Sequence, residues 1–392
     1  MKFTNFNKYF FIYLSFIFLS SVFFITKTYK LDVNNSMAEW IINYQGGFGR
    51  RGFLGEVFSQ ISLIFNFQIR KLILFFLYIF LICYYAMAFF YLKDFKKNYL
   101  FTLSLFSPLV FMFPISELEA LGRKDMLIPL LFLYFCLLFK KLNFYFLSIF
   151  LLILYSILLL THEVSIFYLP FFYLLLLFKM NNFSVLKCFV ILFITSIFFL
   201  IIFLLSISIH SPENINEMCN WIVINLNDKC GLGAHVLDRK LIDNINELGG
   251  LKLIDFIRGF FILFFGNLAI FLSICNSSKE KLFFNFQIKY ILFLFFLLSL
   301  IPFGIAVDWG RWYHLSSTML VLAYFFCIKN NLITFNDNSF LTKMINRIFY
   351  RKRIFLFVLF ILCFSWNPKA VYHEDIGSIP AYRALGKIIK YY

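Results

Sequence analysis

The sequence predicts an all-α, polytopic integral membrane protein with about 11 transmembrane helices. Of the 392 residues, 62% are hydrophobic and 14% are charged, whereas soluble domains average about 45–50% apolar and about 25% charged residues. The mean hydropathy is +0.84. Apolar stretches long enough to cross a hydrocarbon core of about 30 Å recur along the whole chain. With 61 Phe residues, most of these helices would be apolar on every side, as expected in lipid.

The apolar stretches follow one another with short polar connections. We place the spans at residues 9–26, 72–92, 99–115, 126–142, 143–161, 164–178, 185–209, 259–275, 289–306, 312–328 and 354–366. Lys2 and Lys8 precede the first span and no small-residue cleavage pattern follows it, so we expect an uncleaved signal anchor. The chain is therefore expected to form one transmembrane domain over residues 1–392, with longer loops at 27–71 and 210–258.

Basic residues indicate the orientation of the chain. Lys and Arg concentrate in alternate short connections, as in residues 93–97 and 140–141. Cytoplasmic loops of membrane proteins carry an excess of these residues, so we expect the N-terminus inside and the C-terminus outside. The same bias explains the net charge of +16 without a nucleic-acid partner, because the basic residues are distributed among short loops between spans.

Two cysteines lie outside the predicted spans. Cys219 and Cys230 share the loop 210–258, which the orientation places outside, where a disulfide could close it. The sequence leaves open whether they pair or are two free thiols. All five Trp residues also fall on the outer side. An aromatic belt at the membrane surface is one interpretation, and rings that cover a sugar or another flat ligand are the other.

The loop 27–71 contains a glycine- and arginine-rich segment. Five glycines in the ten residues 46–55 allow tight bends that present backbone N–H groups to an anion. Arg50 and Arg51 add planar forks of donors that suit a diphosphate. The alternative is a re-entrant turn whose arginines meet only lipid headgroups.

A second outer segment precedes the span at 126–142. It contains Glu119, Arg123 and Lys124, and the spacing of four residues puts Glu119 and Arg123 on one helical face. The segment is therefore either a self-neutralising helix start or a site in which Glu119 is a base and the two cations bind an anion.

A third outer segment, His162-Glu163, has apolar helix directly on both sides and joins the fifth and sixth spans as a helical hairpin. Ionisable groups at this depth are costly unless they are paired or face a cavity. A His beside a carboxylate can act as an acid/base unit. The alternative is a polar cap on a tight helix–helix turn.

A fourth outer segment joins the ninth and tenth predicted spans. Asp308, Trp309, Arg311 and His314 lie within seven residues. A carboxylate, a cation, an imidazole and an aromatic ring could hold both a sugar and a phosphate. The alternative is an internal pair between Asp308 and Arg311. We interpret His373-Glu374-Asp375 in the outer tail as solvated surface.

The sequence predicts neither a metal site nor a cofactor. It contains no paired His or Cys at zinc-binding spacing. A nucleophilic Ser elbow, a Walker loop and a dinucleotide-binding fingerprint are also absent. An enzyme that acts outside the cytoplasmic membrane has no nucleotide sugars at hand. Its donor must arrive already activated, most simply on a lipid diphosphate carrier.

In length, number of spans, Phe/Leu/Ile-rich composition and Arg-bearing outer loops, the chain resembles the bacterial O-antigen polymerases. More broadly, it resembles membrane glycosyltransferases that use polyprenyl-linked donors. Those polymerases carry an Arg and a Gly separated by ten residues in their large outer loops, a spacing that Arg239 and Gly250 have in the loop 210–258. The other large loop carries no second copy.

The resemblance implies polymerisation of lipid-linked repeat units on the periplasmic face of the bacterial inner membrane, in O-antigen or capsular polysaccharide biosynthesis. The reducing-end sugar of the growing glycan would leave undecaprenyl diphosphate and join a hydroxyl of the next lipid-linked unit. The expected partners are the lipid-linked oligosaccharide, membrane lipids and a chain-length regulator. The expected catalytic residues are His162, Glu163, Asp308 and Glu119. The expected ligands of diphosphate and substrate are Arg50, Arg51, Arg123, Lys124, Arg239, Trp309, Arg311 and His314.

Two other classes of function remain open. A transferase that adds single sugars from a polyprenyl-phosphate donor would have its base in the first outer loop, at Glu39 or Glu56. A flippase or other transporter of lipid-linked glycans would line a central cavity with charges at mid-span, whereas the charges here gather at the ends of the predicted spans.

Overall fold

The computed structural model describes residues 6–29, 35–93, 98–117, 120–180, 183–207, 212–231, 237, 241–279, 282–283 and 286–364. Helices make up 78% of the structure, and the described part contains 17 α-helices, which confirms the all-α class. Two compact units are distinguished. Unit 1 comprises residues 1–17, 88–117 and 246–392, and unit 2 comprises residues 18–87 and 118–245.

Within the described part of the chain, five helices are long and apolar enough to cross a membrane. They are α1 (Phe6–Thr28), α4 (Ile69–Leu92), α8 (Phe144–Thr161), α10 (Val185–Ser206) and α14 (Leu253–Cys275). Each coincides with a predicted span. On α10, large apolar side chains such as Leu186 and Phe189 are more than half exposed, which suits a helix surrounded by lipid because its backbone hydrogen bonds are satisfied internally. The helices therefore support a membrane protein.

The remaining predicted spans are short or interrupted. Several breaks coincide with prolines, which cannot donate a helical hydrogen bond. Pro108 lies between α5 (Tyr99–Leu105) and α6 (Phe113–Ser116), and Pro170 is the second residue of α9 (Leu169–Lys179), which follows the 3₁₀ turn η3 (Glu163–Tyr168). The other short helices are α7 (Leu127–Leu138), α15 (Ile288–Leu298), followed by η4 (Ile301–Gly304), and α18 (Lys352–Phe364). The count of 11 spans thus remains a prediction.

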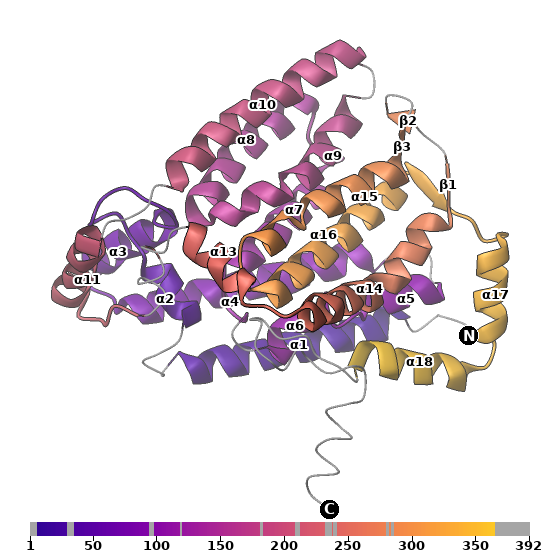
Figure 1. Cartoon of the computed structure of the whole chain (residues 1–392), viewed down its shortest axis with the longest axis horizontal. Helices are drawn as coiled ribbons and strands as arrows, with labels where there is room; N and C mark the ends of the chain where they lie inside the picture. Colours follow the sequence, from indigo (N-terminus) through magenta and orange to yellow (C-terminus); the bar gives the residue numbers. More distant parts are fainter. Residues whose placement is uncertain are drawn as a thin grey trace, which may run out of the picture. The chain divides into compact units, whose positions relative to one another are not determined.

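In unit 1, α16 (Trp309–Lys329) is the most protected helix. Every residue from Trp309 to Cys327 is buried, and the helix packs against α14 and α15 (Figure 1). Two of its hydroxyls have partners inside the unit: Ser316 donates to the carbonyl of Ser299 at 3.1 Å, and the Thr318 hydroxyl lies 3.4 Å from Nδ1 of His314. This helix contains more polar residues than a lipid-facing helix would, because it contacts protein on all sides.

Unit 1 also contains short elements that the sequence did not indicate. Strand β1 (Ser277–Lys279) pairs antiparallel with β4 (Ile333–Phe335), and β2 (Leu282–Phe283) pairs with β3 (Phe286–Gln287). After β4 comes the amphipathic helix α17 (Phe340–Ile348).

In unit 2, the loop between α2 (Asn35–Ile41) and α3 (Phe53–Phe65) lies close to two turns, one before α7 and one after α8. The unit also contains the 3₁₀ turn η2 (Lys124–Met126), α11 (Pro212–Leu226) and α13 (Leu241–Gly249), which continues into unit 1. Helix α8 lies beside α10 (Figure 1), and α3 contacts both α8 and α11. Because α2 also contacts α3 and η2, the loop between α2 and α3 reaches the turns before α7 and after α8.

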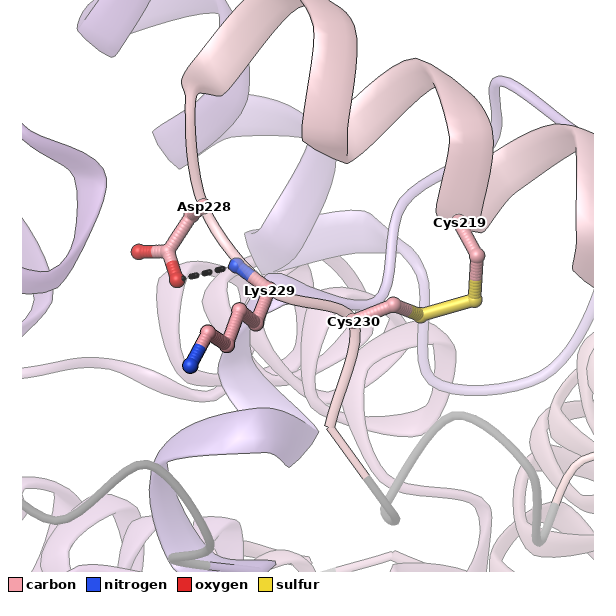
Figure 2. The surroundings of a disulfide bond; sticks show 4 residues. All are labelled: Cys219, Asp228, Lys229 and Cys230. Carbon is pink, nitrogen blue, oxygen red and sulfur yellow. Dashed lines mark hydrogen bonds between the residues drawn. A yellow bond between two sulfur atoms is a disulfide. The ribbon is translucent and has the colours of Figure 1, made fainter.

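A disulfide joins the middle of α11 to the segment that follows this helix in unit 2. Figure 2 shows the Cys219 side chain on the helix joined to Cys230 in the segment that follows it. Next to the bridge, Asp228 accepts hydrogen bonds from Nε of Arg70 at 2.7 and 2.9 Å. The disulfide attaches the segment after α11 to that helix, and the ion pair attaches it to α4.

We expect that changing both Cys219 and Cys230 to Ser lowers the free energy of unfolding by about 2–3 kcal/mol, because a disulfide restricts the unfolded chain and this loop is short. Thermal unfolding of the purified protein, with and without reductant, measures the effect. An unchanged melting temperature would show that the bridge contributes nothing to stability.

Candidate functional site

Seven ionisable side chains are gathered in unit 2, where the loop between α2 and α3 meets the turns before α7 and after α8. We name them the charge cluster: Glu39, Arg51, Arg123, Lys124, Asp125, His162 and Glu163. Six are more than nine-tenths buried, and the Arg51 side chain is 14% exposed. Burying ions is costly even when they are paired, so a cluster of this size at helix ends of a membrane protein points to function.

Arg51 links the two sides of the cluster. Its Nε donates to both oxygens of Glu163 at 2.9 and 3.0 Å, and its Nη2 lies 2.7 Å from Oε1 of the same carboxylate. Its Nη1 lies 3.8 Å from Glu39. The backbone of Arg51 has a φ of +66°, an unfavourable conformation for a residue with a long side chain. Such strain is often found at binding sites.

Lys124 holds the backbone at this strained position. Its Nζ donates to the carbonyl oxygen of Arg51 at 2.7 Å, and the side chain is fully buried. The amine lies 5.8 Å from the ring centre of Trp40, whose indole N–H donates to the carbonyl of Gly122 at 2.7 Å. The neighbouring Arg123 donates to Glu39 at 3.1 Å.

The cluster shifts the ionisation of two of its members. The pKa of Lys124 is lowered to about 7, and burial is the largest cause. The charge of Arg51 also lowers this pKa, whereas the charges of Glu39 and Glu163 raise it. For Glu163, burial alone would raise the pKa, but the charge and hydrogen bonds of Arg51, with contributions from His162 and Arg50, lower it well below its usual range. Glu163 is therefore ionised at neutral pH, and Lys124 changes charge near neutrality.

We expect the affinity for an anionic ligand at the charge cluster to fall as the pH rises above about 7. The unfolded chain keeps the Lys124 proton until about pH 10.5, whereas the folded protein loses it near pH 7. Raising the pH through this window therefore stabilises the fold while it removes a binding charge. Binding assays between pH 6 and 9, comparing the wild type with Lys124→Met, measure this. Parallel pH profiles for the two proteins would contradict it.

His162 forms the second chemical unit of the cluster. Its Nε2 lies 2.6 Å from a carboxylate oxygen of Asp125, and the imidazole is fully buried. The other ring nitrogen, Nδ1, has no hydrogen-bond partner among the described residues, and neither do the neighbouring hydroxyls of Thr161 and Ser165. A His held by a carboxylate on one nitrogen, with the other nitrogen unoccupied, is the arrangement of a general base.

Three glycines between α2 and the first turn of α3 lie at closely packed positions. A Cβ at Gly55 would lie 1.8 Å from the carbonyl oxygen of Ile42, and one at Gly52 would lie 2.2 Å from the Tyr44 ring. At Gly46 it would lie 1.9 Å from the carbonyl of Asn214 in α11. These glycines let α2, α3 and α11 approach closely, and they lie on either side of Arg51 in the sequence.

We expect Gly55→Ala to destabilise the protein by about 1–3 kcal/mol or more, because the added methyl group meets rigid backbone. Gly249→Ala is the matched control, since nothing lies within 4 Å of a Cβ at that position. Thermal unfolding in detergent compares the two variants. Equal melting temperatures would contradict this prediction, because they would show that α2 and α3 can move apart to accommodate the methyl group without a loss of stability.

A second group of polar residues lies at the start of α16 in unit 1. Arg311 donates to Asp308 at 2.5 Å and lies 5.0 Å from the ring centre of Trp312. His314 Nδ1 bonds the carbonyl of Leu109 at 2.9 Å, and Trp309 donates to the carbonyl of Phe303. The internal pair of Asp308 with Arg311 is thus present, and these side chains are bonded to their own unit.

The structure brings some of the predicted site residues together and leaves others apart or undescribed. Arg51, Arg123, Lys124, His162 and Glu163 come together in one cluster, and Arg50 is close enough to act on Glu163. His162 and Glu163 do not form one acid/base unit, because they pair with Asp125 and Arg51 respectively. Glu119 and Arg239 lie outside the described residues.

The sequence predictions did not name Asp125 as a site residue and considered Glu39 only for a single-sugar transferase. Asp125 directly follows the predicted cations, and Glu39 directly precedes the buried Trp40. An acidic residue next to an apolar run was the available signal for each.

No protein-family model, curated protein or solved structure matches this chain.

Proposed function

We propose that the chain is a membrane glycosyltransferase that polymerises lipid-linked oligosaccharide repeat units, with undecaprenyl diphosphate as the leaving group. The observation that supports this most is the convergence of Arg51, Arg123 and Lys124 with the His162–Asp125 pair in a single buried cluster. Three cations suit a diphosphate, and a held imidazole suits a hydroxyl nucleophile.

In the proposed reaction, the bond between C1 of the donor's reducing-end sugar and the diphosphate oxygen breaks. A new bond forms between C1 and a hydroxyl oxygen of the acceptor unit. His162 takes the hydroxyl proton while Asp125 stabilises the imidazolium. The electron pair of the broken bond leaves with the diphosphate, whose charge Arg51, Arg123 and Lys124 stabilise. Arg50 lies beside them as a further ligand.

We place the reaction on the periplasmic face of the bacterial inner membrane. The disulfide between Cys219 and Cys230 in unit 2 supports an oxidising compartment for this loop, because disulfides are rare in the cytosol. The same unit carries the charge cluster. The basic residues of the short loops support the opposite side as cytoplasmic.

A transferase of single sugars from a polyprenyl phosphate is the second candidate. The observation that favours it is the position of Glu39 inside the cluster, 3.1 Å from Arg123. Glu39 would then be the base. Glu39→Gln and His162→Gln separate the two candidates, because the base of the true reaction is the one whose loss abolishes turnover while substrate still binds.

Gel analysis of lipopolysaccharide or capsule from a deletion strain tests the proposal in the cell. Loss of the long-chain ladder with one repeat unit retained is the expected result. Accumulation of single lipid-linked units outside supports a polymerase. Their accumulation on the cytoplasmic leaflet would overturn the proposal and favour a flippase. An unchanged ladder would exclude a role in polymerisation.

A further inference from the structure

Helix α17 in unit 1 has an apolar surface that is wider than the part covered by protein. On one side, Thr342, Ile345 and Phe349 (the residue after the helix) are buried. On the neighbouring side, Phe340, Met344 and Ile348 are 83%, 44% and 47% exposed. Their spacing of four residues aligns them along one face of the helix. A nine-residue helix in water gains nothing from exposing three large apolar side chains in a row.

The buried side of α17 attaches the helix to the end of a membrane-length helix. The side-chain amide of Asn276, directly after α14, donates to the Thr342 hydroxyl at 2.5 Å and to the carbonyl of Asn336 at 3.1 Å. Beyond α17, the Phe349 ring packs against Phe355 of α18 at 5.4 Å. Because α17 is fixed where one apolar helix ends and another begins, it lies at the level of a membrane surface.

The charges on and after α17 have one sign. Its exposed polar side includes Lys343 and Arg347, next to the exposed apolar residues around the helix. Arg351 directly precedes α18, Lys352 and Arg353 are its first two residues, and no acidic residue occurs between positions 339 and 364. An amphipathic helix with an apolar face and a basic border matches an interface of anionic lipids.

We infer that α17 is an interfacial helix that lies in the membrane surface, with Phe340, Met344 and Ile348 among the acyl chains and Lys343 and Arg347 on anionic phospholipid headgroups. This inference is independent of the proposed enzymatic function, because it involves none of the residues of the charge cluster. It assigns an occupant to a surface of unit 1 that the described residues leave uncovered.

A spin label on the full-length protein tests the inference. Cys83 and Cys275 are the exposed free thiols, so both are changed to Ser, and a nitroxide is attached at Met344→Cys. Asn346→Cys, on the polar side of the same helix, is the matched control. The protein is reconstituted in phosphatidylcholine vesicles with or without phosphatidylglycerol, and accessibility to oxygen and to a water-soluble nickel chelate is measured.

With phosphatidylglycerol, we expect the label at 344 to be accessible to oxygen and protected from nickel, and the label at 346 to show the reverse. Adding Lys343→Gln and Arg347→Gln should abolish the difference between the two vesicle compositions. Nickel accessibility at 344 equal to that at 346 would overturn the inference, and so would protection from both reagents, which would mean that protein covers the face. Equal depth in both vesicle compositions would overturn the preference for anionic lipid.

Discussion

Arg51→Gln is expected to abolish glycosyl transfer, with a rate loss of roughly 10²–10³-fold or more, the typical effect of removing one group that stabilises a developing negative charge. The same change leaves the carboxylate of Glu163, 7% exposed, without its bidentate partner. Breaking a buried ion pair on one side costs about 3–5 kcal/mol, so the melting temperature should fall as well. Turnover of a lipid-linked donor and thermal unfolding are measured on the same preparation.

Arg70→Gln is the matched control for this loss of stability. Arg70 makes a bidentate pair with Asp228 at the same closest distance of 2.7 Å, and its side chain is 18% exposed. It lies outside the charge cluster. We expect Arg70→Gln to lower the melting temperature while the folded protein keeps its turnover. Equal turnover losses in the two variants would show that Arg51 acts only through stability.

His162→Gln is expected to reduce the rate of transfer by roughly 10²–10⁴-fold, the usual contribution of a positioned general base. The affinity for the donor should change little, because the proposed ligands of the diphosphate are the three neighbouring cations. Asp125→Asn should reduce the rate less, since it removes only the group that orients the imidazole. Rates and donor affinities are measured separately with purified protein.

The double variant distinguishes a base from a structural residue. If His162 and Asp125 act as one unit, His162→Gln combined with Asp125→Asn loses no more rate than His162→Gln alone. Additive losses would contradict a shared role in proton transfer. Loss of donor binding in either variant would instead indicate a role in shaping the site.

The membrane-length helices were predictable because they depend on local composition. Long apolar runs without charges give α1, α4, α8, α10 and α14. The ends of the shorter helices could not be predicted, because an apolar stretch of sequence can continue through a turn. Neighbouring elements of the fold then supply the hydrogen-bond partners of the backbone in that turn. The internal position of α16 was equally hidden, since its polar residues depend on contacts with other helices.

Five of the seven residues of the charge cluster (Arg51, Arg123, Lys124, His162 and Glu163) were selected from the sequence, but their partners could not be. The spacing of four residues predicted that Arg123 faces Glu119, which lies outside the described residues. The structure shows a partner that the spacing could not indicate, Glu39, 84 positions away. Arg51 pairs with Glu163 across 112 positions, and His162 pairs with Asp125 across 37. Sequence spacing can predict pairs of side chains within one helix. The pairs in the charge cluster depend instead on how the loop between α2 and α3 packs against the turns before α7 and after α8.

Reconstitution with a defined lipid-linked repeat unit tests the enzymatic proposal most directly. Purified protein in proteoliposomes is given the undecaprenyl-diphosphate-linked unit, and glycan length and released carrier are measured. We expect the wild type to lengthen the glycan and release one undecaprenyl diphosphate per bond formed, and His162→Gln and Arg51→Gln to do neither. Movement of the intact unit across the bilayer without any lengthening, or undiminished lengthening by the two variants, would contradict the assignment of chemistry to the charge cluster.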